Sequence, residues 1–479
     1  MTLSDVLYTS GERHAERAAV TDVRSGRAMT YGALVRESRA VAGFLRTQGV
    51  GPGHRVALVA PNGSSYLPAA FGLLETGACV VPLATNLVPA EMAEIIRQID
   101  VNACLSAPAV RGATIGQRSR VSGGACDGFT FEWIDRGAAG PSELSGLDPA
   151  FIRFTSGTTD RSKGVVLSHE ATLARVEAAD RVLRFTAGDR IVWVLPLAYH
   201  FAVTIVAYVR AGAHILMCGD TLPHAVIDAT RRFEATVLYA SPFHFERLAN
   251  LGATDALKSL RLALSTSAPI SQAVIGTFEA AYGVPVAQAY GIIEAGLPCI
   301  NTRIDGLPAS SVGRPVPGYE VVVVSEDGTP VPARERGEVA VRGAGLFSAY
   351  YRPWQPREGV TRDGWFHTGD IGWQDESGAL YLAGRRNTVI LVAGVKFFPE
   401  EVEDCINRFP GVKESRVFGD AHPRLGQVPR AEIALDAPGV DLDALQAHCA
   451  GALSSYKVPV EFTIVPAIAK TPGGKVLRR

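Results

Sequence analysis

Residues 154–164, FTSGTTDRSKG, combine glycine and hydroxyl side chains with a single lysine, Lys163. Glycine lets successive backbone N–H groups point at one anion, and Ser and Thr hydroxyls add donors, so the segment is typical of a phosphate-binding loop. Its spacing differs from the GxxxxGK[ST] pattern of P-loop ATPases, and Asp160 adds an acid. An ordinary polar surface turn has the same composition, so the loop alone leaves both interpretations open.

Further segments with chemically useful residues follow this loop along the chain. They are STSAPIS (265–271), QAYGIIEAG (288–296), GWFHTGD (364–370), YLAGRRNTVILVAGVKFFPEEVE (381–403) and TPGGKVLRR (471–479). In this order and at these distances they resemble the adenylate-forming superfamily, which includes acyl- and aryl-CoA synthetases, nonribosomal peptide synthetase adenylation domains and firefly luciferases. The resemblance extends over nearly the whole chain. It implies a reaction in which a carboxylate attacks the α-phosphate of ATP, pyrophosphate leaves, and an acceptor then displaces AMP.

The resemblance also assigns residues to ATP, the predicted cofactor. The loop would hold the departing β- and γ-phosphates, Tyr290 would stack on the adenine, and Asp370 would bind the ribose hydroxyls. Arg385 would reach the ribose and the phosphate. The predicted ATP-binding residues are Thr155, Ser156, Gly157, Thr158, Thr159, Lys163, Ala268, Pro269, Tyr290, Gly291, Ile293, Asp370, Arg385 and Lys475.

Lys475, Glu294 and Arg385 are the predicted catalytic residues. In-line attack on phosphorus needs positioning and charge neutralisation more than an acid or a base. By resemblance, Lys475 bridges the substrate carboxylate and the α-phosphate. Glu294 is the predicted metal ligand and would hold Mg²⁺, a hard cation that prefers oxygen.

Three features depart from the family pattern: the phosphate loop, the hinge and the residue before Glu294. Asp160 and Ser162 stand where the loop usually has glycine and proline, and Asn387 replaces the usual hinge residue. Ile293 stands where a threonine normally donates a hydrogen bond to the α-phosphate, a loss of about 1.5–3 kcal/mol. A catalytically silent ATP- or acyl-binding relative is therefore the alternative to an active enzyme.

The acid-binding pocket is predicted in 195–208, in 241–248 and in the strands that carry residues 265–267 and 291–293. The first of these stretches contains no aspartate to pair with an ammonium group, which disfavours an α-amino acid. Aromatic side chains favour an aromatic or medium-chain acid. Tyr199 takes the place of the family's gating histidine or, with a shift of one residue, His200 does. The predicted pocket residues are Tyr199, His200, Phe201, Phe243, His244, Ser267, Gly291 and Ile292.

The acceptor is predicted to be a thiol, either CoA or the phosphopantetheine of an acyl carrier protein. By resemblance, Gly394 and Lys396 line its channel. These residues do not separate the two thiols, and a non-thiol acceptor such as an amine is a further alternative.

Composition narrows the possible partners. The 479 residues contain 47 basic and 48 acidic side chains, which does not suggest nucleic acid as a partner. We find no signal peptide and no apolar stretch of roughly 18 residues, so no membrane span is expected. Seven scattered cysteines without a CxxC pair favour a reducing cytoplasm. The expected small-molecule partners are a carboxylic acid and ATP.

The order of short apolar runs and helical patterns predicts an α/β protein. Runs such as 55–60, 79–84 and 190–197 read as buried strands separated by helices, which implies parallel-rich sheets covered on both faces. A β-rich lobe is predicted at about 311–383. We predict a large N-terminal domain over 1–384 and a small, mobile α+β domain over 385–479, with the hinge at 385–388.

Overall fold

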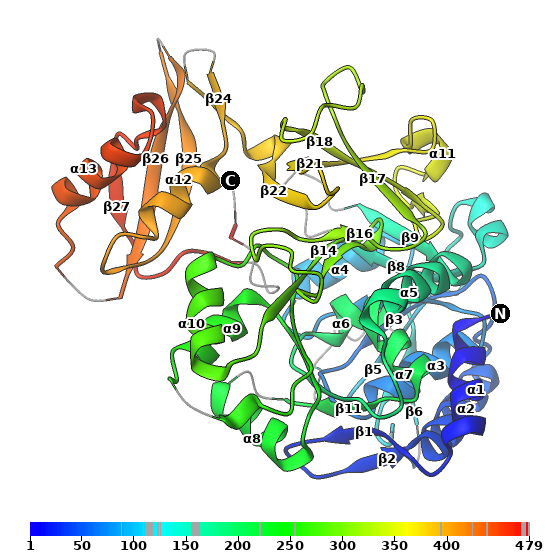
Figure 1. The fold of residues 1–479 in the computed structure, drawn as a ribbon. Coiled ribbons are helices and arrows are strands. Elements are labelled where there is room, and N and C mark those ends of the chain that lie inside the picture. Colours follow the sequence, from blue (N-terminus) through cyan, green and yellow to red (C-terminus); the bar gives the residue numbers. More distant parts are fainter. Residues whose placement is uncertain are drawn as a thin grey trace.

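The computed structural model describes residues 1–87, 89–108, 110, 118–121, 124, 126–154, 163–219, 222–252, 255–392, 395–423, 425–436, 439–470 and 476–477. These residues form four β-sheets, two of nine strands, one of four and one of five. Figure 1 shows helices around the large sheets and a small sheet with two helices near the C-terminal end. The predicted α/β fold class, with a β-rich lobe and a small C-terminal α+β part, is confirmed.

One nine-stranded sheet has a parallel centre, β8-β4-β3-β5, and antiparallel strands on both sides. Its order is β20 (Gln355–Pro356), β19 (Ala349–Tyr350), β9 (Gly164–Ser168), β8 (Pro149–Phe154), β4 (Cys79–Leu83), β3 (Arg55–Val59), β5 (Ala103–Ser106), β7 (Thr130–Trp133) and β6 (Arg118–Arg120). Every residue of β3 is buried, which explains why the run at 55–60 is apolar without alternation.

The second nine-stranded sheet is also parallel at its centre, from β1 to β14. Its order is β16 (Arg314–Pro315), β15 (Gly296–Asn301), β14 (Val286–Ile292), β13 (Leu262–Ser265), β12 (Val237–Ala240), β10 (Arg190–Trp193), β11 (His214–Met217), β1 (Ala18–Asp22) and β2 (Ala28–Thr30). The parallel strands bring their carboxyl ends to one edge of the sheet.

Helices connect the strands and pack on the sheets. They are α1 (Leu3–His14), α2 (Tyr31–Thr47), α3 (Tyr66–Glu75), α4 (Pro89–Gln98), α5 (His169–Leu183), α6 (Leu197–His200), α7 (Val206–Ala211), α8 (Pro223–Phe233), α9 (Pro242–Ala249), α10 (Gln272–Tyr282) and α11 (Arg357–Val360). One apolar cluster contains Phe151 of β8, Trp193 of β10 and Phe201, so the two large sheets share a core. No helix in the described part of the chain has the length and apolarity that crossing a membrane requires.

The β-rich lobe and the C-terminal part have their own sheets. The lobe is the antiparallel sheet β17 (Tyr319–Val324), β18 (Gly337–Gly343), β21 (Phe366–Gln374) and β22 (Leu380–Arg385). The last sheet contains β23 (Ile390–Val392), β24 (Val395–Phe397), β25 (Val412–His422), β26 (Gly426–Leu435) and β27 (Phe462–Ile464), with α12 (Pro399–Ile406) and α13 (Leu442–Ala452). A separate apolar cluster that includes Ile390, Val402 and Leu445 fills this part. The domain boundary at 384/385 stays a prediction.

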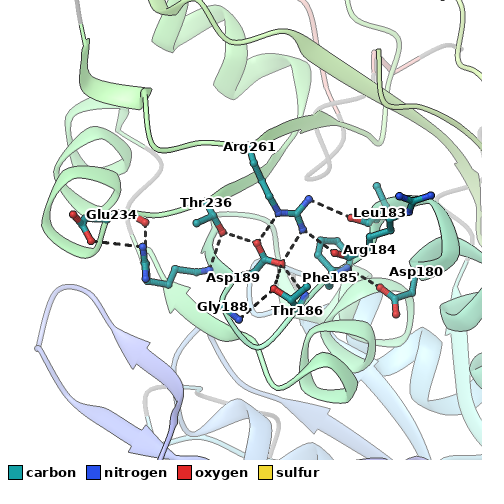
Figure 2. A network of polar contacts seen from close by, with 11 residues as sticks. Asp180, Leu183, Arg184, Phe185, Thr186, Gly188, Asp189, Glu234, Thr236 and Arg261 are labelled. Carbon is teal, nitrogen blue, oxygen red and sulfur yellow. Dashed lines mark hydrogen bonds and ion pairs between the residues drawn. The ribbon is translucent and has the colours of Figure 1, made fainter. Parts of the chain in front are cut away.

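A buried carboxylate, Asp189, aligns the amino ends of three neighbouring strands (Figure 2). Its Oδ1 accepts hydrogen bonds from Arg261 Nε at 2.7 Å and Thr236 Oγ1 at 2.8 Å, and its Oδ2 accepts from Arg261 Nη2 and Thr186 N, both at 2.8 Å. Asp189, Thr236 and Arg261 directly precede β10, β12 and β13. The contacts fix the relative positions of strands whose other ends lead into the predicted pocket.

We expect Asp189→Asn to lower the free energy of unfolding by about 1–3 kcal/mol, because a bidentate, charge-assisted pair becomes a neutral contact. The expected loss of unfolding free energy is moderate because Arg261, the partner of Asp189, is 40% exposed and water screens the pair. Urea unfolding followed by tryptophan fluorescence measures it, since Trp193 lies on β10. The control is Asp255→Asn, which breaks the exposed pair with Lys258. Equal midpoints for the two variants would contradict the role given to Asp189.

His214, at the start of β11, is a partly buried polar group at this end of the sheet. Its Nε2 lies 2.8 Å from Thr21 Oγ1. Burial, followed by the positive charge of Arg190, lowers the pKa of His214 to about 4. The native state therefore holds this imidazole neutral at pH values where the unfolded chain protonates it.

Stability is expected to fall as the pH drops from about 6.5 to 4, because the unfolded chain binds the extra proton in this window. His214→Gln removes that contribution, and the loss of unfolding free energy between pH 7 and pH 4.5 is expected to shrink by about 1–2 kcal/mol. Urea unfolding at both pH values measures it. The control is His224→Gln, at an exposed histidine, which should lose as much unfolding free energy between pH 7 and pH 4.5 as the wild type does.

Candidate functional site

Two of the predicted site segments directly follow the carboxyl ends of strands from the parallel parts of the sheets, where ligands bind in open α/β sheets. Phe154 ends β8, and Thr266 directly follows β13. Part of the predicted site lies outside the described residues, namely Thr155, Ser156, Gly157, Thr158, Thr159, Gly394, Lys475 and the side chains of Asn387 and Lys396.

Asp370 joins two other predicted nucleotide-binding residues. Its Oδ2 accepts a hydrogen bond from the Tyr290 hydroxyl at 2.6 Å, and its Oδ1 accepts from Arg385 Nε at 2.8 Å. The pairing of β21 with β22 places Asp370 opposite Arg385. Burial, followed by the charge of Asp370, raises the pKa of Tyr290 and keeps its hydroxyl protonated as a donor. Tyr290, Asp370 and Arg385 are distant in the sequence, and they thus form one hydrogen-bonded polar group.

Glu294 lies in the turn between β14 and β15, close to the end of the phosphate loop. Tyr350 donates a hydrogen bond to Glu294 Oε1 at 3.0 Å. Lys163 Nζ lies 4.6 Å from the centre of the Tyr350 ring, a cation–π distance. Tyr350 therefore connects the predicted metal ligand with the predicted phosphate-binding lysine, and β9 and β19 hold the two sides together.

Arg175 of α5 is a site residue that the sequence analysis missed. It is buried, and it donates to the carbonyl oxygens of Ile293 at 3.0 Å, Glu294 at 3.3 Å and Gly345 at 2.6 Å. Phe347 N also donates to Glu294 O at 2.7 Å. These bonds fix the backbone that carries Glu294. The sequence did contain a signal for Arg175, namely an arginine on the buried face of a helix.

The backbone around the predicted adenine site is constrained. Ser267 has φ +77°, unusual for a residue with a side chain, and such strain is common at ligand sites. Ala268 is partly buried and Pro269 exposed. A Cβ on Gly291 would lie 2.8 Å from Leu297 Cδ2 and 2.9 Å from Gly296 O, so only glycine fits there.

The predicted pocket residues have different surroundings. Phe201 is buried and packs against Tyr66, Phe71 and Phe151, within the core between the sheets. His200 is partly buried and meets Trp193 and Tyr239 edge-on. Tyr199 is also partly buried, as are Ile292 and Ile293 on the β14 side.

Trp193 at the end of β10 and Tyr239 in β12 form an aromatic pair, which we call the aromatic wall. The rings of Trp193 and Tyr239 stack at 5.5 Å with an interplanar angle of 8°. His244, at the start of α9, is buried, and its Nδ1 lies 2.8 Å from Ser241 Oγ. Burial, followed by the charge of Arg247, lowers the pKa of His244 to about 4, so it is neutral at pH 7. Phe243 is 38% exposed and lies outside this wall.

Arg153 of β8, which the sequence analysis also missed, is a buried cation between the two large sheets. It is 6% exposed and donates to the Tyr199 carbonyl. Burial, followed by the positive charge of Arg175, lowers the pKa of Arg153 to about 10, so the guanidinium is still charged at neutral pH.

The described residues contain no group of three or more His, Cys, Asp or Glu side chains able to hold a metal ion. Mg²⁺ commonly binds proteins through one or two carboxylates and completes its shell with substrate phosphates and water. Glu294, partly buried beside Lys163 and Tyr350, fits that limited role.

Comparisons with known proteins agree with this arrangement. This chain is 29% identical to a sulfoacetate–CoA ligase of Cupriavidus necator, in an alignment that covers 100% of this chain and 96% of that protein. A feruloyl-CoA synthase of Amycolatopsis sp is 29% identical over 95% of this chain and 93% of its own. The crystal structure of ATP-bound MatB from Rhodopseudomonas palustris superposes with a TM-score of 0.86 at 26% identity, covering 99% of this chain and 97% of that one.

Family models match both parts of the chain. The model of the AMP-binding enzymes matches residues 7–351, and the model of the AMP-binding enzyme C-terminal domain matches residues 401–475. The two matches follow each other in the order that the resemblance predicted. The chain therefore belongs to the family of AMP-binding enzymes.

Proposed function

We propose that this protein is an AMP-forming acid–CoA ligase, which converts a carboxylic acid and ATP into an acyl-adenylate and pyrophosphate and then transfers the acyl group to CoA. The observation that carries the proposal is the pair of consecutive family matches over 7–351 and 401–475. Relatives that align with nearly the whole chain are named as CoA ligases and synthases.

In the adenylation step, Asp370 would bind the ribose hydroxyls. Both of its oxygens already accept hydrogen bonds from Tyr290 and Arg385, but a carboxylate oxygen has a second lone pair for a further donor. Arg385, half exposed, is free to turn from Asp370 toward a phosphate oxygen while Tyr290 holds the carboxylate. The ribose is thus positioned by groups that are already ordered.

The phosphates would lie between Glu294 and Lys163, which Tyr350 connects. When bound, Mg²⁺ neutralises charge on the phosphates, and Glu294 is the residue that would hold it. Arg175 keeps the Glu294 backbone in place. Ile293 cannot donate to the α-phosphate, so the adenylation step depends more heavily on Lys475.

The second step is proposed to require a rotation of residues 385–479 relative to 1–384 about the hinge at 385–388. Besides Arg385–Asp370, two ion pairs of the described residues connect the parts across this boundary. Arg386 Nη2 lies 2.9 Å from Glu338 Oε2, and Arg336 Nη1 lies 2.5 Å from Glu401 Oε1. Both arginines are half exposed. The partner carboxylates are more buried, Glu338 at 7% and Glu401 at 20% exposed. Ion pairs that water reaches from one side contribute modestly to stability, which suits an interface that must open.

The acid is proposed to be aromatic or of medium chain length, from the aromatic wall of Trp193 and Tyr239. The relatives do not narrow the acid further, since their names include sulfoacetate, feruloyl and long-chain fatty acid ligases. CoA is the proposed acceptor, and a carrier-protein phosphopantetheine stays the alternative.

ATP–pyrophosphate exchange with a panel of aryl, acyl and dicarboxylic acids tests the function. Acid-dependent exchange, followed by thioester formation when CoA is added, is the expected result. Exchange without transfer to CoA would redirect the acceptor toward a carrier protein or an amine. ATP binding without exchange for any acid would favour a silent binding protein and contradict the proposal.

Lys475→Ala is expected to reduce acid-dependent exchange by about 100-fold or more, because charge on both reactants loses its counter-ion in the transition state. ATP binding, measured by calorimetry, should change little. The control is Lys413→Ala, which removes an exposed lysine from β25. Exchange at the wild-type rate in Lys475→Ala would remove this lysine from the mechanism.

Arg336→Ala should change the rates of adenylation and thioester formation in opposite directions by about 2–5-fold, because it weakens one of the two domain arrangements. Single-turnover measurements of each step detect the change. Arg334→Ala is a matched control, since Arg334 lies two residues away and its partner Glu376 belongs to the same lobe. Two rates that stay unchanged in Arg336→Ala would exclude a role for this pair in the rotation.

A further inference from the structure

We propose that the acid activated by this enzyme carries a second anionic group, a carboxylate or a sulfonate, and that Arg153 binds it. The inference rests on the proposed ligase function and deepens it, because it identifies the substrate class from a cation that the adenylation chemistry does not use.

Arg153 differs from the other buried arginines in its hydrogen bonds. Arg55 uses all three of its nitrogens, donating to the carbonyls of Gly53, Ile99, Asp100 and Ala138. Arg175 likewise uses all three nitrogens on backbone carbonyls. Arg416 has a carboxylate partner, Glu432, at 2.6 Å. Among the described residues, Arg153 makes one hydrogen bond, from Nη2 to the Tyr199 carbonyl, and no ion pair.

A buried guanidinium is costly unless its charge and its donors are matched. Glu294 attracts Arg153 electrostatically without forming an ion pair with it, and Glu294 Oε1 already accepts from Tyr350. Arg175, the other charge that acts on Arg153, repels it. Among the described residues no carboxylate forms an ion pair with Arg153, so this part of the chain leaves its positive charge open to an anionic ligand.

The surroundings of Arg153 are rich in hydrogen-bond donors. Tyr66, which is 1% exposed and interacts electrostatically with Arg153, has a hydroxyl without a partner in the described part of the chain. Trp193 Nε1 is buried and without a partner in the same part. Trp193 stacks on Tyr239, which also feels the charge of Arg153. A planar guanidinium with further donors is suited to a carboxylate or a sulfonate.

The position of Arg153 favours the acid over the nucleotide. Its hydrogen bond goes to Tyr199 of α6, in the predicted acid pocket, and its tyrosine neighbours are Tyr66, Tyr199 and Tyr239. The groups proposed to bind the ribose, Tyr290 and Asp370, are joined to Arg385 instead. An anion on the α-phosphate is the competing occupant, and the experiment below separates the two.

The test compares acids in pairs, each a dianionic acid and its monoanionic counterpart, such as succinate with its monoamide and phthalate with its monomethyl ester. In ATP–pyrophosphate exchange, the wild-type enzyme is expected to prefer at least one dianionic acid by about 30-fold or more in kcat/KM. Arg153→Met should abolish this preference by lowering kcat/KM for the dianionic acid only. Arg210→Met, at a half-exposed arginine, should keep it.

Two further measurements keep the outcomes distinct. The first is ATP binding without acid, measured by calorimetry, which should be equal in the wild type and in Arg153→Met. The second is the preference of Tyr66→Phe for the dianionic acid, which should be about 3–10-fold lower than that of the wild type. A parallel loss for every acid, or weaker ATP binding, would assign Arg153 to the phosphate and overturn the inference. Wild-type exchange with monoanionic acids alone would also overturn it and leave the ligase function standing. Exchange with no acid at all would instead contradict the ligase function.

Discussion

The hydrogen bonds of Arg175 to three backbone carbonyls hold the centre of the site. They connect α5 with the turn after β14 and with the loop before β19, so that residues from both large sheets are fixed relative to one another. Because Arg175 is buried, water does not compete for these carbonyls. Glu294 and Lys163 lie on elements that are distant in the sequence, and both can then contact Tyr350. Glu294 does so through a hydrogen bond and Lys163 through a cation–π contact.

The two parts of the chain are stabilised in different ways, and the difference matches their proposed roles. The large sheets share an apolar core, whose burial gives a strong and rigid connection. The C-terminal sheet has a core of its own, and half-exposed ion pairs of Arg336 and Arg386 connect it to the lobe. Small polar interfaces of this kind permit relative motion of domains. A ligase that rebuilds its site between two steps needs this combination.

Apart from Asn387 at the predicted hinge, the departures from the family pattern belong to the predicted phosphate site. Ile293 removes a donor to the α-phosphate, while Arg175 still holds the Ile293 carbonyl, so the backbone keeps its place although the side chain has changed. Arg153 adds a buried charge near Tyr199, a residue of the predicted acid pocket. The proposed acid site is therefore not described by its aromatic residues alone.

The sequence by itself determined the family and the alternation of strands and helices, and it predicts Glu294, Asp370 and Arg385 as site residues. It did so because buried parallel strands must be continuously apolar, as β3 and β4 are, and because the motif residues occur in a characteristic order. Only the tertiary structure revealed the contacts of Arg175 and Arg153, on which their proposed roles rest. Each is a single arginine in an otherwise ordinary helix or strand, and its meaning depends on which carbonyls or charges the fold brings within reach. Phe201, predicted in the pocket, has its ring contacts in the core between the sheets for the same reason, since packing across two sheets is not encoded in local spacing.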